Sequence, residues 1–117
     1  MMASSVILLV VYVGLAVVVV GCANGRIGIN AVAGIRTANT MANEQTWLAA
    51  HRAARTPTII GIVAAVISLA PAFFGGSEPE QTLLVVLSVA LLMVGVIVGT
   101  IVGTRAARAV LASQEHR

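Results

Sequence analysis

Residues 34–52 read GIRTANTMANEQTWLAAHR, and this stretch differs sharply from the sequence on either side of it. It holds Trp47, the only Trp of the chain, together with one of the two His and two of the seven Arg. Elsewhere the 117-residue chain is dominated by apolar residues, so that 59% of all residues are hydrophobic and 9% are charged. Soluble globular domains carry about 25% charged residues. The composition is therefore that of an integral membrane protein, in which this polar stretch separates apolar runs.

Three apolar runs surround the polar stretch, and each is long enough to cross a bilayer as a helix. Residues 4–23 carry no charge, and two further apolar runs cover residues 58–74 and 81–104. A helix needs roughly 20 residues, with a range of about 17–25, to cross about 30 Å of hydrocarbon. We therefore expect an all-α integral membrane protein, a single domain over residues 1–117 with three transmembrane helices.

Two interpretations of the first apolar run compete with a transmembrane helix. A secretory signal peptide normally begins with Lys or Arg, and residues 1–5 contain neither. Val19-Val20-Gly21-Cys22 resembles a lipoprotein processing site, at which Cys22 would be lipidated. We favour a transmembrane helix that ends in small residues. Whether Cys22 is lipidated is not decided by the sequence.

Residues 24–56 connect the first two runs, and we expect a loop followed by a short helix. Gly and Asn are frequent in the first half, which is typical of loops. Thr40 can serve as a helix N-cap, with Glu44 in the first turn, and Thr56-Pro57 can end this helix and begin the next. We expect an amphipathic helix at the level of the lipid headgroups, with Trp47 at the membrane interface.

Arginine alternates between the connections. None precedes the first run, four lie between the first and second, none lies in the turn near residues 75–80, and three lie in the tail, residues 105–117. By the positive-inside rule the N-terminus faces outside, whereas residues 24–56 and the C-terminus face the cytoplasm. The sequence pI of 10.6 reflects these separate groups of Arg, which do not form one basic face, so we expect no nucleic-acid partner.

Small residues recur at helical spacing in the second and third runs. Gly95, Gly99 and Gly103 are four residues apart, a pattern that lets two helix backbones approach closely. A similar stripe in the second run consists of Gly61, Ala65, Ser68 and Ala72. The two stripes predict an antiparallel pair within one chain, and a homodimer through the same glycines is the alternative.

The residues that could carry chemistry are few. Tyr12 and Cys22 are the only ionisable side chains within the apolar runs, which argues against an ion pump. Glu44 and His51, seven residues apart, are the only candidates for a general acid/base pair. His51 has no second His or Cys at ligand spacing, so we expect no metal, no cofactor and no enzymatic activity.

The polar stretch resembles the SdpI family of small bacterial membrane proteins. The resemblance is carried by a Gly-Ile-Arg-Thr element followed by Thr, Asn, Trp and a His-Arg pair, here Gly34, Ile35, Arg36, Thr37, Thr40, Asn43, Trp47, His51 and Arg52. Ala38 stands where family members often carry Pro. The resemblance implies a bacterial inner-membrane protein that confers immunity to a secreted Sdp toxin, with a second role in sequestering a transcriptional repressor at the membrane.

These nine motif residues have a structural and a functional interpretation. In the first, Asn43, Trp47 and His51 form one helix face, pinned by Arg36, that closes the ends of the three helices. In the second, Arg36 and Arg52 are anion-facing donors that bind a lipid headgroup or a partner protein. The candidate partners are membrane lipids, a peptide toxin, a regulator protein or a larger membrane complex. Three functions compete. The protein is a binding protein for toxin immunity or signal sensing, an accessory subunit of a larger membrane complex, or an oligomeric transporter.

Overall fold

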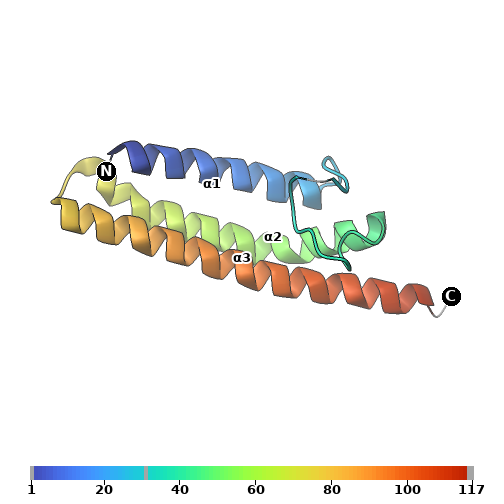
Figure 1. Ribbon diagram of the computed structural model, residues 1–117. Helices are drawn as coiled ribbons and strands as arrows, with labels where there is room; N and C mark the ends of the chain where they lie inside the picture. Colours follow the sequence, from blue (N-terminus) through green and yellow to red (C-terminus); the bar gives the residue numbers. More distant parts are fainter. Residues whose placement is uncertain (1, 31, 116–117) are drawn as a thin grey trace.

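The computed structural model describes residues 2–30 and 32–115 as three long helices and one short 3-10 helix. The order along the chain is α1 (Met2–Ala23), α2 (Glu44–Leu69), η1 (Ala70–Phe74) and α3 (Glu78–Glu115). All three long helices are long and apolar enough to cross a membrane, which confirms the predicted fold class. They run side by side in an elongated bundle of 60 × 21 × 18 Å (Figure 1).

Helix α1 is uncharged and ends in a glycine-based cap. Gly25 adopts a positive φ of 80° and donates its N–H to the Cys22 carbonyl at 3.3 Å, while Arg26 donates to the Gly21 carbonyl at 2.9 Å. This pair of bonds is a Schellman motif, which satisfies carbonyls that the last helical turn leaves free. The side chain of Ile27 folds back over Gly21. Cys22 is buried in this last turn.

The N-cap of helix α2 is Asn43 and not Thr40, so the predicted N-cap was wrong. Asn43 is extended, its side-chain oxygen accepts the Thr46 N–H at 3.0 Å, and the Thr46 hydroxyl accepts the Asn43 N–H at 3.0 Å. These reciprocal bonds form a capping box. Glu44 lies in the first turn, where its negative charge interacts favourably with the positive end of the helix dipole.

The predicted break at Thr56-Pro57 is absent, because Pro57 lies inside the continuous helix α2. A short separate helix between the first two spans is therefore not formed. Proline inside a helix costs about 3 kcal/mol or more. Packing against α3 offsets this cost, because α2 contacts the same face of α3 on both sides of the proline. Ala50, before Pro57, lies against Gly103, and Gly61, after it, lies against Gly95.

The end of α2 is set by Pro71. The chain passes from the α-helix into the 3-10 helix η1, which has proline at its start, and then into Gly75 and Gly76 with φ of 112° and 109°. Both values lie in a region that only glycine adopts easily. Phe74 is 90% exposed beside this turn.

Helix α3 is longer than predicted at both ends. Its 38 residues span about 57 Å, well beyond the roughly 30 Å of a hydrocarbon core. The expected separate tail at residues 105–117 continues α3 as far as Glu115, and His116 and Arg117 lie outside the described residues. Ala, Arg, Leu and Gln dominate this extension, and all four favour helices. It extends beyond the C-terminal end of α1 and the N-terminal end of α2 (Figure 1).

Helices α2 and α3 pack through the small residues. A methyl group added at Gly95 would lie 2.7 Å from the Cα of Gly61, and one added at Gly103 would lie 2.8 Å from the Ala50 carbonyl oxygen. Gly99 faces Thr58 in the same way. These three glycines of α3 are buried within the chain, against α2.

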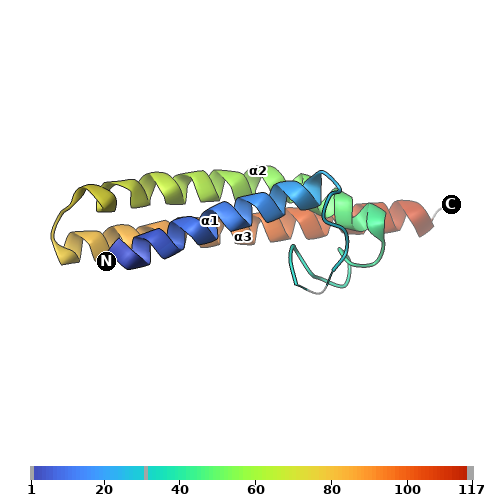
Figure 2. The same ribbon diagram turned by 90° about the horizontal axis from the view of Figure 1, so that it is seen from above.

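Helix α1 lies over the α2–α3 pair and crosses it diagonally, from the α3 side at its N-terminus to the α2 side at its C-terminus (Figure 2). The core beneath it consists of Tyr12, Ile62, Ala65, Leu69 and Leu92. Near the middle of α1, the Tyr12 hydroxyl lies 2.6 Å from the Ser88 hydroxyl of α3. From that contact towards its C-terminus, α1 moves away from α3.

Candidate functional site

The loop between α1 and α2 folds against the first turns of α2, and His51 holds it there. The backbone N–H of Ile35 donates to Nε2 of His51 at 2.8 Å, and Nδ1 lies 2.7 Å from the Trp47 carbonyl oxygen. Because an amide N–H can only donate, Nε2 must be the unprotonated nitrogen and Nδ1 must carry the proton. Neutral imidazole therefore bridges the loop and α2 through two backbone groups.

The electrostatics of His51 agree with this arrangement. The side chain is buried, and it belongs to the polar first turns of α2, before the apolar span that starts near residue 58. Desolvation of the imidazolium lowers the pKa of His51 below its usual value, while the hydrogen bond to the Trp47 carbonyl acts in the opposite direction. Glu44 is exposed, and both ring nitrogens of His51 are engaged by backbone groups, so these two residues form no acid/base pair.

Gly34 is required at its position for two reasons. Its φ of 98° lies in the left-handed region, and an added methyl group would lie 2.8 Å from Nε2 of His51 and 2.9 Å from the ring of Trp47. The neighbouring Thr37 and Thr40 close a tight turn, in which the Thr37 N–H donates to the Thr40 hydroxyl and that hydroxyl lies 2.8 Å from the Ile35 carbonyl oxygen. The two threonines therefore fix the backbone around Arg36.

Trp47 does not face lipid headgroups, contrary to the prediction. Its side chain is 1% exposed, its indole N–H donates to the Ile27 carbonyl at 2.9 Å, and its ring lies 4.3 Å from that of His51 between centroids. A buried indole N–H needs an acceptor, and the carbonyl of Ile27 supplies one. Trp47 therefore belongs to the interior of the protein, under the loop.

Asn43 does not share the face of Trp47 and His51. As the N-cap it is extended, and its amide donates to Gln114 of α3 at 2.9 Å; Gln114 in turn donates to Gln45. This network joins the start of α2 to the extension of α3. Nothing in the sequence pointed to Gln114, because its partner lies 71 residues away.

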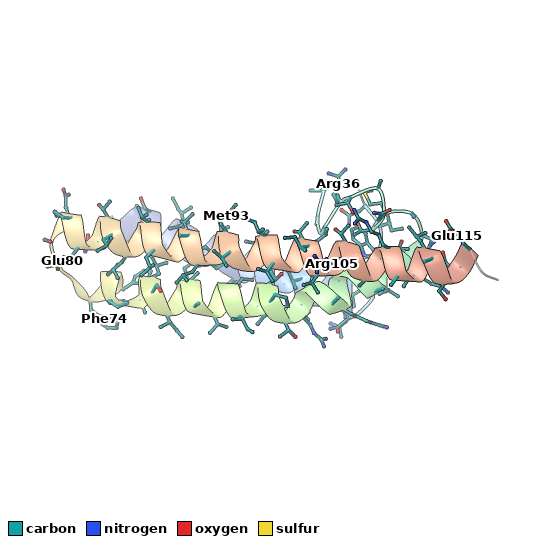
Figure 3. The ribbon with its side chains drawn as sticks, turned by 90° about the horizontal axis from the view of Figure 1, so that it is seen from below. Arg36, Phe74, Glu80, Met93, Arg105 and Glu115 are labelled. Atoms are coloured by element: carbon teal, nitrogen blue, oxygen red, sulfur yellow. The ribbon has the colours of Figure 1, made fainter. Side chains whose placement is uncertain are left out.

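The arginines of the motif play different parts. Arg52 donates its Nε–H to the Ala23 carbonyl at 3.2 Å, which places a positive charge at the C-terminus of α1. Cations at helix C-termini are favourable because of the helix dipole. Arg36 is exposed and points away from the helices (Figure 3), so the loop is pinned by the backbone of Ile35 and not by Arg36.

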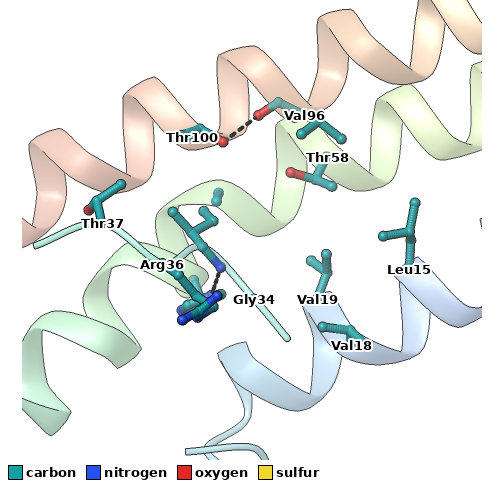
Figure 4. A pocket seen from close by; sticks show the side chains of 12 residues that line it. Leu15, Val18, Val19, Gly34, Arg36, Thr37, Thr58, Val96 and Thr100 are labelled. Atoms are coloured by element: carbon teal, nitrogen blue, oxygen red, sulfur yellow. Dashed lines mark hydrogen bonds between the residues drawn. The ribbon is translucent and has the colours of Figure 1, made fainter. Parts of the chain in front are cut away.

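Beneath this loop lies a cavity of about 310 Å³ between all three helices (Figure 4). Its walls consist of Leu15, Val18 and Val19 of α1, residues 34–37 of the loop, His51, Ala54 and Thr58 of α2, and Val96 and Thr100 of α3. The cavity lies where α1 diverges from α3, so sequence periodicity gave no signal for it. Within residues 2–30 and 32–115, no three His, Cys, Asp or Glu side chains are grouped so that they could hold a metal ion.

Three helices of membrane-spanning length, joined at one end by a folded polar loop, define a multi-pass membrane protein. Residues 26–104 match the SdpI/YfhL protein family, and the chain belongs to this family. The match contains all nine motif residues and confirms the resemblance seen in residues 34–52. No curated protein and no solved structure matches the chain.

Proposed function

We propose that this protein is a toxin-immunity or signal-sensing factor that acts by binding and not by catalysis. Membership of the SdpI/YfhL family supports a membrane protein of the immunity type. The observation that carries the binding role is that some motif residues make contacts within the protein and another makes none of these and faces outward. Gly34, Trp47 and His51 are used to build the loop, whereas Arg36 is left exposed on it. An exposed guanidinium on a fixed backbone is suited to recognise an anionic group of a partner.

We also propose the bacterial inner membrane as the location, with the loop and the C-terminus in the cytoplasm. The distribution of charge along the bundle supports this orientation. Arg36 and Arg105 lie towards one end, whereas Glu80 and Phe74 lie at the other (Figure 3). Arginine-rich connections face the cytoplasm by the positive-inside rule.

An accessory subunit of a larger complex is the alternative. The glycines of α3 would suit it as a docking surface, because small residues let another helix approach closely. Gly95, Gly99 and Gly103 are occupied by α2 in this structure. A docking partner would have to use another surface. This observation favours the immunity or sensing role over the subunit role.

The test is survival of the native bacterium when it is exposed to peptide toxins secreted by its own or neighbouring strains. Deletion of the gene should sensitise the cells, and the wild-type gene should restore resistance. Arg36→Gln should fail to restore it, whereas Arg55→Gln, a change at another exposed arginine outside the nine motif residues, should restore it. Unchanged sensitivity after deletion, or full rescue by Arg36→Gln, would overturn the proposal.

A further inference from the structure

The cavity beneath the loop combines an apolar interior with a charged rim. Leu15, Val18 and Val19 line one side and Val96 the other, all from apolar spans. The hydroxyl of Thr100 donates to the Val96 carbonyl at 2.8 Å, so it needs no polar partner inside the cavity. An apolar space beside a hydrocarbon medium suits a hydrocarbon occupant.

Arg36 supplies the charge at the rim, and it is exposed. None of the residues that line the cavity is acidic, so the positive charge of Arg36 is not neutralised there by a carboxylate of this chain. The rim lies where the apolar spans give way to the polar loop. In a bilayer this is the level of the lipid phosphates, to which arginine binds through paired N–H donors.

The size and the chemistry of the cavity both agree with a lipid as its occupant. The cavity measures about 310 Å³, at the lower limit of small-ligand pockets, about 300–1,000 Å³. Its apolar walls and the positive charge at its rim match the two parts of a phospholipid, an acyl chain and a phosphate.

We propose that this cavity binds one acyl chain of an anionic membrane phospholipid, whose phosphate accepts hydrogen bonds from the guanidinium of Arg36. The acyl chain lies between α1 and α3, where the two helices diverge (Figure 4). The lipid fills the space that the diagonal course of α1 leaves open. The site uses Arg36, the side chain to which the proposed function also assigns recognition of a partner. It needs no toxin and no regulator, so a failed lipid-binding test would leave the immunity role standing.

Trp47 offers an intrinsic probe of this site. It is the only Trp, and its ring contacts His51, which lines the cavity. The full chain is reconstituted in phosphatidylcholine vesicles that contain a minor fraction of lipid with brominated acyl chains, because bromine quenches Trp fluorescence at short range. The brominated lipid is phosphatidylglycerol in one series and phosphatidylcholine in the other, so the two series share their acyl chains and differ in the headgroup, anionic in the first and zwitterionic in the second.

Two pairs of variants separate the acyl chain from the headgroup. Val19→Phe fills the cavity, and Val13→Phe is its control, because Val13 is 57% exposed and lies outside the lining. Arg36→Gln removes the proposed phosphate donor, and Arg55→Gln is its control. Circular dichroism and the emission maximum of Trp47 establish that each variant is folded.

In the wild type, brominated phosphatidylglycerol should quench Trp47 more strongly than brominated phosphatidylcholine. Val19→Phe should lose this additional quenching and Val13→Phe should keep it; Arg36→Gln should lose the headgroup difference and Arg55→Gln should keep it. Equal quenching of the wild type by both lipids would overturn the proposal. So would additional quenching that survives in Val19→Phe or in Arg36→Gln.

Discussion

The hydroxyl groups of Tyr12 and Ser88 lie 2.6 Å apart, and both side chains are fully buried between α1 and α3. Each residue supplies the hydrogen-bond partner that the other could not find in an apolar environment. This contact marks the point from which α1 diverges, so it fixes both the attachment of α1 and the opening of the cavity.

Removal of one hydroxyl should weaken the attachment of α1. Hydrogen bonds between membrane helices contribute about 0.6 kcal/mol on average and up to about 1.7 kcal/mol. Tyr12→Phe and Ser88→Ala should each lower the free energy of unfolding by about this amount, and the double variant by less than the sum. Equilibrium unfolding in mixed micelles measures the three values. Strict additivity would show that the two hydroxyls do not interact.

Substitution of Gly95 should separate α2 from α3. The added methyl of Gly95→Ala would meet the Cα of Gly61, a backbone atom that cannot turn aside. Overpacking of this kind costs about 1–3 kcal/mol. Gly14→Ala is the matched control, since nothing lies within 4 Å of its added methyl, and it should be neutral or slightly stabilising. Thermal unfolding in detergent compares the two, and equal melting temperatures would contradict the packing.

Gly34→Ala should release the loop from α2. The substitution combines a positive φ with a clash against His51 and Trp47, and strained backbone alone costs about 1–3 kcal/mol. The emission of Trp47 should shift to longer wavelength, and iodide should quench it more strongly than in the wild type. Gly28→Ala has open space around it and should leave both signals unchanged. Identical spectra for Gly34→Ala and the wild type would refute the contact.

Acidification should open the same loop through His51. The pKa of His51 is lowered in the folded protein, so the unfolded chain binds the proton more readily. Stability is therefore complete above the ordinary histidine pKa of about 6.5 and declines as the pH falls below it. Protonated Nε2 also cannot accept the Ile35 N–H. Unfolding followed between pH 7.5 and 5 should show this decline in the wild type, and a much flatter profile in His51→Phe would identify the group.

The proposed orientation predicts which positions a membrane-impermeant thiol reagent can reach. Ser77 and Ser113 are exposed near opposite ends of the bundle, and Cys22 is buried, so the background should be low. In intact cells Ser77→Cys should react with the reagent, whereas Ser113→Cys should react only after the membrane is permeabilised. The reverse pattern would show that the loop and the C-terminus face outside.

The sequence predicted which residues belong to the candidate site, but not which groups they contact. The unusual combination of Gly34, Trp47 and His51 marks the motif in the sequence, because these residue types stand out from an apolar chain. Their partners do not. The indole of Trp47 binds the carbonyl of Ile27, and Arg52 binds that of Ala23. Every residue carries a carbonyl, so no sequence pattern distinguishes the two that are used.

The sequence by itself determined that three helices are long and apolar enough to cross a membrane, and which polar segment joins the first two. Both follow from sums over neighbouring residues, because the transfer of a helix into hydrocarbon depends on its own length and composition. The spacing of Gly95, Gly99 and Gly103 likewise placed small residues on one helix face before any partner was known.

Tertiary structure alone decided that α2 continues past Pro57, which side chains are buried, and where space remains. Helix α2 continues through Pro57 because its contacts with α3 lie on both sides of the proline. Trp47 is buried because the loop returns over it, and the cavity exists because α1 diverges from α3. Each outcome depends on contacts between residues far apart in the chain, which local composition and periodicity do not encode.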